Sequence, residues 1–134
     1  MKIKEYGLRN KKQDYYLQRK QVMKHIYEAK QIARECGINH PRIEIRITEK
    51  SKECLGLATI NSKNKNIWIT EEAINRHDLR SIVFHEILHT LYNQDHVKNC
   101  QLMHEATLPD KYSNPTTQNK LITALFIKYI TKNK

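Results

Sequence analysis

Apolar residues return every three or four positions between residues 13 and 36, which is the period of a helix with one buried face. The residues that form this stripe are Tyr15, Val22, Ile26, Ala29, Ala33 and Cys36. Gly37 suits the position just after a helix end, and Pro41 follows soon afterwards. Residues 1–12 are polar and rich in lysine, so we expect a loose basic arm ahead of the helix.

The period then changes to two, because residues 42–48 alternate between polar and apolar side chains. This alternation predicts a half-buried strand. Residues 54–60 and 67–70 predict two more strands, with a polar turn over 61–66 between them. We therefore expect a small mixed sheet of about three or four strands.

A second helix is predicted after Asp78, which is a suitable N-cap, and should end near residues 92–93. Its residues are apolar almost all the way round, so the helix should be buried. Residues 94–115 lack a regular pattern, and a last helix is predicted from 116 or 117 to about 132. The order of elements predicts an α+β fold in which the sheet packs on the first helix and on the buried one, all within a single domain.

The composition excludes several classes of protein. The chain has only three glycines, so it contains no glycine-rich phosphate loop. Cys36, Cys54 and Cys100 are odd in number and widely spaced, so neither a disulfide framework nor a zinc knuckle is expected. We find no signal peptide and no apolar run near the ~20 residues of a membrane span, and we expect a cytoplasmic protein with reduced thiols.

The net charge of +10 is carried by the two ends of the 134-residue chain. Residues 1–46 have a net charge of +7 and residues 111–134 of +5, whereas residues 47–110 stand at −2. Such flanks could bind nucleic acid, or they could form a solvated, lysine-rich surface. The second interpretation is favoured, because the tyrosines show no clear stacking pattern in the sequence.

The slightly acidic middle of the chain contains the motif HEXXH, as His85-Glu86-Ile87-Leu88-His89. Residues four apart share one face of a helix, so both imidazoles can reach one ion. A catalytic zinc ion takes three protein ligands and keeps one position open. Glu86 could then take a proton from a metal-bound water, whose pKa the ion lowers. By chance the motif would occur about 0.03 times in such a chain, so we predict one zinc ion per chain.

A third ligand must come from farther along the chain. His96 is the preferred candidate, Asp95 is the alternative, and Glu105 is a third choice if the site uses a distant glutamate. His104 and Tyr112 follow, and either could polarise a carbonyl or stabilise an oxyanion. These residues predict a zinc metallopeptidase that acts on a peptide or protein. The competing hypothesis is a non-catalytic module that binds nucleic acid or protein.

Residues 85–103, HEILHTLYNQDHVKNCQLM, resemble the metzincin pattern HEXXHxxGxxH followed by a Met-turn, as in matrixins and archaemetzincins. The resemblance implies a zincin-like peptidase domain in which Glu86 is the general base. The implied zinc ligands are His85, His89 and His96. Met103 would be the Met-turn residue, which in this family forms a hydrophobic floor beneath the metal without binding it.

The resemblance extends to a strand upstream of the motif. The segment 54–60, CLGLATI, resembles the edge strand with which this family pairs a bound peptide. By this likeness Gly56, Leu57 and Ala58 would align an extended substrate. The segment NIWIT resembles the neighbouring inner strand, and NPTTQNKLITALFIKYI resembles the C-terminal helix of the family.

The chain departs from the metzincin pattern by one residue. Tyr92 stands where the family has glycine, and Asp95 stands where it has the third histidine. If the helix runs one residue longer, Asn93 takes the turn, because asparagine tolerates the left-handed conformation, and His96 is the ligand. If Tyr92 turns instead, Asp95 becomes the ligand.

A second family, the SprT-like zincins, is also similar. Its members share a leading helix, a strand like HPRIEIRI, an LGxA-type strand, and HEXXH with a later histidine. This resemblance implies that a basic surface binds DNA, and the basic N-terminal helix favours it. Leu102-Met103, followed by a loop and a separate helix, favours the metzincin interpretation.

Overall fold

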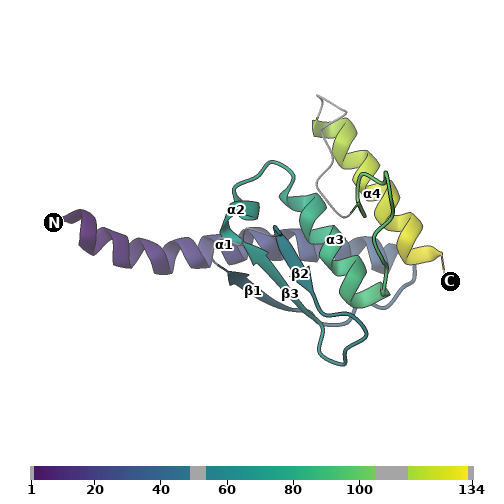
Figure 1. Ribbon diagram of the computed structural model, residues 1–134, viewed down its shortest axis with the longest axis horizontal. Coiled ribbons are helices and arrows are strands. Elements are labelled where there is room, and N and C mark those ends of the chain that lie inside the picture. Colours follow the sequence, from purple (N-terminus) through teal and green to yellow (C-terminus); the bar gives the residue numbers. More distant parts are fainter. Residues whose placement is uncertain (1, 49–53, 105–114, 133–134) are drawn as a thin grey trace.

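The computed structural model describes residues 2–48, 54–104 and 115–132, and it combines helices with one small sheet (Figure 1). This confirms the predicted α+β class. The elements follow one another in the order α1 (Lys2–Glu35), β1 (Glu44–Thr48), β2 (Gly56–Ala58), β3 (Asn66–Thr70), α2 (Glu71–Ile74), α3 (Leu79–Tyr92) and α4 (Pro115–Thr131). No helix in these ranges is both long enough and apolar enough to cross a membrane.

The sheet has three strands in the order β1-β3-β2. β1 runs parallel to β3, with Ile45 opposite Ile67, and β2 runs antiparallel to β3, with Leu57 opposite Trp68. The sheet is therefore mixed, as predicted. β2 lies at an edge of the sheet, so one side of its backbone has no partner strand among the described residues.

The core lies between the sheet, α1 and α3. The buried residues of α1 include most of the predicted stripe, and they face Ile45, Ile67 and Ile69 of the sheet and the apolar residues of α3. The α1 residues in this core are Val22, Ile26, Ala29 and Ala33. Burying a large aliphatic side chain contributes roughly 1.5–3 kcal/mol, so this interface holds α3 firmly in place.

α4 packs on the outer side of α3. The rings of Phe84 in α3 and Phe126 in α4 are fully buried, with their centroids 4.6 Å apart. Arg80 of α3 links three helices, because its guanidinium donates to Glu28 Oε2 of α1 at 3.0 Å and to Thr123 Oγ1 of α4 at 2.6 Å. α3 is therefore enclosed by α1, the sheet and α4.

α1 corrects one expectation of the sequence analysis. Residues 2–12 were expected to be a loose arm, but they are helical, and α1 begins at Lys2. Apart from Gly7, this segment is made of residues that tolerate a helix, and extending an existing helix avoids the cost of nucleation. The first part of α1 extends well beyond the rest of the molecule (Figure 1).

Two further details differ from the predicted elements. β2 is shorter than the predicted strand over 54–60, and the short helix α2 was not predicted. Thr70 caps α2, because its side chain accepts a hydrogen bond from Ala73 N at 3.2 Å. Glu71 and Glu72 then place negative charge at the N-terminus of α2, where the helix dipole favours it.

Candidate metal centre

α3 brings three polar side chains into the core of the protein. His89 and Glu86 are buried and His85 is half-buried, although most of their neighbours on the helix are apolar. Burial disfavours the charged form of an imidazole, and it lowers the pKa of His85 to about 4 and that of His89 in the same direction. Both histidines are therefore neutral at physiological pH.

Backbone carbonyls fix the orientation of both rings. His85 Nδ1 lies 2.7 Å from the carbonyl oxygen of Leu102, and His89 Nδ1 lies 2.5 Å from that of Gln94. A carbonyl oxygen can only accept a hydrogen bond, so each Nδ1 must carry the proton. In a neutral imidazole this leaves the lone pair on Nε2, the atom that then can bind a metal.

His96 reaches the same place from the segment after α3. The helix ends at Tyr92. Asn93 follows as its C-cap in the left-handed conformation (φ 52°, ψ 35°), and Gln94 N donates to Leu88 O at 3.0 Å. The turn thus occurs at Asn93 and not at Tyr92. Of the two alternatives in the sequence analysis, this is the one in which His96 joins His85 and His89. Asp95 does not belong to the group of side chains that converge, and Glu105 lies outside the described residues.

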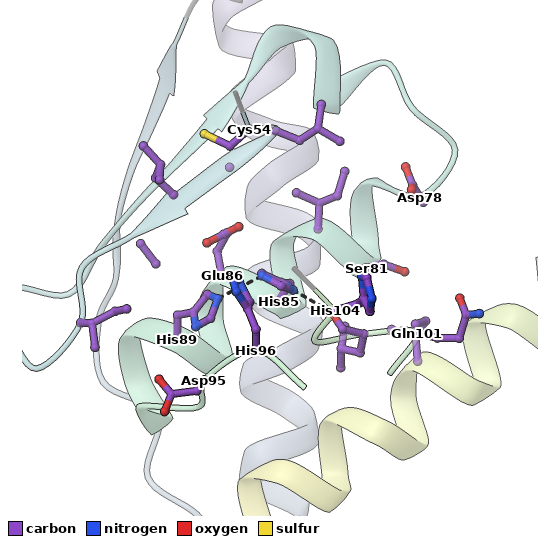
Figure 2. Close-up of a pocket in the computed structure, with 18 of the residues that line it drawn as sticks. Cys54, Asp78, Ser81, His85, Glu86, His89, Asp95, His96, Gln101 and His104 are labelled. Atoms are coloured by element: carbon purple, nitrogen blue, oxygen red, sulfur yellow. Dashed lines mark hydrogen bonds between the residues drawn. The ribbon is translucent and has the colours of Figure 1, made fainter. Parts of the chain in front are cut away.

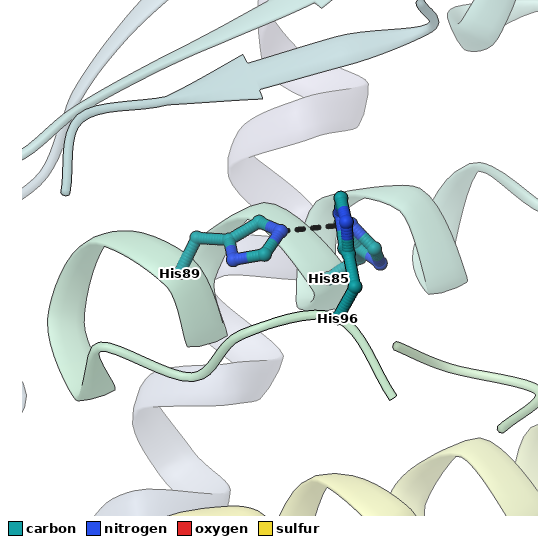
Figure 3. Close-up of side chains that lie close together, drawn as sticks. All are labelled: His85, His89 and His96. Carbon is teal, nitrogen blue, oxygen red and sulfur yellow. Dashed lines mark hydrogen bonds between the residues drawn. The ribbon is translucent and has the colours of Figure 1, made fainter. Parts of the chain in front are cut away.

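The three histidines form one cluster (Figure 3). One nitrogen from each of His85, His89 and His96 lies within 4.8 Å of the other two. The Nε2 atoms of His85 and His89 are only 3.0 Å apart. His89 is buried and His96 is exposed, so one side of the cluster faces the protein interior and the other side faces solvent.

Glu86 lies between α3 and the edge strand β2 (Figure 2). Its side chain is buried, and desolvation raises the pKa of the carboxyl to about 8 in the metal-free protein. Gly56 makes room for this carboxylate, since a Cβ at that position would lie 2.9 Å from Glu86 Oε2. A side chain at position 56 would therefore force the Glu86 side chain to shift.

A groove of about 780 Å³ opens onto the cluster (Figure 2). β2 forms one wall through Gly56, Leu57 and Ala58, and α3 forms the floor. The other residues with hydrogen-bonding side chains that line the groove include Asp78, Ser81, Gln101, His104 and Gln118. The groove therefore brings the predicted substrate strand and the histidine cluster to one site.

Two of the remaining predicted site residues are described. Met103 is fully buried, next to Leu102, whose carbonyl oxygen accepts from His85. The carbonyl oxygen of Met103 accepts from Val97 N at 2.7 Å, so Met103 is fixed against the segment that carries His96. His104 lines the groove, whereas Tyr112 lies outside the described residues.

The sequence analysis missed the groups that orient the histidines. Leu102 and Gln94 act through backbone carbonyls, which every residue possesses, so no residue type could have identified them. Gln101 lies within the segment 85–103 and Gln118 within α4, but neither stands at a position to which the metzincin-like pattern assigns a role. Comparisons with protein-family models, with curated proteins and with solved structures found no significant match to this chain.

Gly56→Ala should destabilise the protein by about 1–3 kcal/mol, because the new methyl group would overlap the Glu86 carboxylate. Chemical denaturation of a double-mutant cycle with Glu86→Ala measures this effect, since the second substitution removes the atoms in the way. The cost of Gly56→Ala should nearly vanish in the Glu86→Ala background. An equal cost in both backgrounds would show that β2 and Glu86 are not in contact.

Proposed function

We propose that this protein is a zinc-dependent metallopeptidase with a zincin-like fold, which hydrolyses peptide bonds in a peptide or protein substrate. The observation that carries the proposal is the convergence of His85, His89 and His96 beside a buried Glu86, at the open side of a groove. Three imidazoles are a ligand set of catalytic zinc.

The chemistry of the donor atoms fits a cation. With both Nδ1 atoms donating to carbonyls, the Nε2 atoms of His85 and His89 have only lone pairs to direct at each other, 3.0 Å apart. Two such acceptors repel each other unless a positive centre lies between them. A zinc ion held by these nitrogens would supply Lewis acidity and would lower the pKa of a bound water towards about 7.

Glu86 is the proposed general base. Its carboxyl group faces the groove wall at Gly56. The positive charge of a bound zinc ion would favour the ionised carboxylate, which can take a proton from water at the cluster. The same carboxyl group can then return the proton to the amine that leaves. A site that held zinc only for structure would not need a carboxylate buried in this position.

β2 is the proposed binding strand for the substrate. It is an edge strand that lines the groove, and Leu57 directs an exposed side chain outwards. An extended peptide could pair with its open edge through backbone hydrogen bonds, which would lay the scissile bond along the groove. The buried Met103, behind the ligand segment, supports the metzincin-like form of this proposal.

Wild-type protein should bind one zinc ion per chain, and His96→Ala should lose most of its zinc affinity. Asp95→Ala should bind like the wild type, because Asp95 lies outside the cluster. Elemental analysis gives the stoichiometry, and titration against a competing chelator gives the affinity. A zinc-free wild type, or a loss confined to Asp95→Ala, would contradict the proposed ligand set.

Glu86→Gln should keep zinc but lower peptide hydrolysis by about 10²–10⁴-fold, because the amide cannot take up the proton. Mass spectrometry of a peptide library incubated with zinc-loaded protein measures cleavage. Glu35→Gln, an exposed position at the end of α1, is the matched control and should cleave like the wild type. Cleavage that survives Glu86→Gln would refute the proposed mechanism.

A second candidate function, binding of nucleic acid, is favoured by the exposed side of α1. Three cations and three large side chains follow one another there at spacings of three or four residues, so they share one face of the helix. The exposed residues of this cationic stripe are Tyr16, Lys20, Met23, Tyr27, Lys30 and Arg34. Lysines that contact phosphates and tyrosines that stack on bases are a common way to bind single strands.

Lys20→Gln with Lys30→Gln should weaken binding of a short fluorescent single-stranded DNA and reduce the salt dependence of its affinity by about two phosphate contacts. Fluorescence anisotropy over a range of salt concentrations measures both quantities. Lys63→Gln with Lys128→Gln makes the same change in net charge at exposed positions elsewhere, and should have little effect. No binding by the wild type at low salt would rule out this candidate.

A further inference from the structure

Gln94 lies between the end of α3 and His96. Both its main chain and its side chain make hydrogen bonds. Its carbonyl oxygen accepts from His89 Nδ1 at 2.5 Å, and its N–H donates to Leu88 O at 3.0 Å. Its side-chain amide donates to Asp95 O at 3.0 Å and accepts from Lys132 Nζ. Gln94 is only 6% exposed, so the orientation of its amide depends on these partners.

The end of α4 supports the ligand segment 94–103 at two places. Lys132, directly after α4, donates to Gln94 just before His96. Three residues earlier, Tyr129 OH lies 3.1 Å from Cys100 Sγ, and Cys100 Sγ accepts from Met103 N at 3.3 Å. The segment that supplies the third histidine is therefore fastened to α4 on both sides of that histidine.

We propose that Lys132 is a positioning residue for the metal centre and acts through Gln94 on His89. A hydrogen bond from a charged amine is stronger than one between neutral groups, so Lys132 fixes the Gln94 side chain more firmly than water would. A fixed Gln94 keeps its carbonyl in place, and this carbonyl holds the proton of His89 on Nδ1 and leaves Nε2 for the metal. The inference rests on the proposed zinc site.

The sign of the electrostatic effect makes the inference testable. Lys132 is a cation near a site for a cation, so removal of its charge alone should strengthen zinc binding. Loss of its hydrogen bond to Gln94 should weaken zinc binding, as loss of groups that orient ligands generally does. The direction of the change in a Lys132 variant therefore separates positioning from simple repulsion.

Lys132→Met should bind zinc about 10–100-fold more weakly than the wild type, and Lys132→Arg, which keeps a charged donor, should restore most of the affinity. Lys128→Met is the matched control. Lys128 Nζ lies 5.9 Å from the centroid of the Tyr129 ring, close to the 6.0 Å of Lys132, but within the described residues it makes no hydrogen bond to Gln94. Competition with a chelator measures all four affinities.

A second measurement on the metal-free protein keeps this inference separate from the zinc site. The ¹⁵N chemical shifts of the His89 ring should report a single Nδ1–H tautomer in the wild type and in Lys128→Met, and a mixture of tautomers in Lys132→Met. Unchanged zinc affinity together with an unchanged tautomer in Lys132→Met would overturn the inference while leaving the proposed function intact. A wild type that binds no zinc would overturn both.

Discussion

The structure depends on the hydrogen bonds that satisfy the two histidines of α3. An unpaired polar group in a protein core costs about 1–3 kcal/mol. α3 buries the imidazole of His89 and the carboxyl group of Glu86, and it half-buries the imidazole of His85. His85 and His89 offset this cost by donating to the carbonyls of Leu102 and Gln94. Both acceptors belong to the chain after α3, so that chain has to fold back over the helix.

The fold-back also explains the place of α4. The segment 94–103 contains little regular structure, and its path is held by contacts of side chains with the end of α4. α4 is in turn fixed to α3 by Phe126 against Phe84, and by Arg80, which reaches Thr123. α3 therefore positions α4, and α4 positions the segment that completes the cluster on α3.

Hydrophobic periodicity predicted the elements whose position is decided by burial. Ile45, Ile67 and Ile69 are buried in the strands where alternation placed them, and α3 is enclosed, as its apolar surface required. Periodicity could not predict the start of α1, because residues 2–12 do not show a regular apolar stripe. α2 is a single turn stabilised by a Thr70 cap, a local interaction that an apolar pattern does not reveal.

The site was predictable as far as side-chain spacing decides it. The spacing of His85 and His89 places both on one helix face, but the choice between Asp95 and His96 depends on which residue turns left-handed, and this is Asn93. The hydrogen bond from Lys132 to Gln94 depends on the end of α4 meeting the segment 94–103, which no local pattern encodes. The cationic stripe of α1 lies on a different face of that helix from Val22 and Ala29, which pack in the core. No residue of that stripe lines the groove, so the two proposed functions would use different parts of the surface.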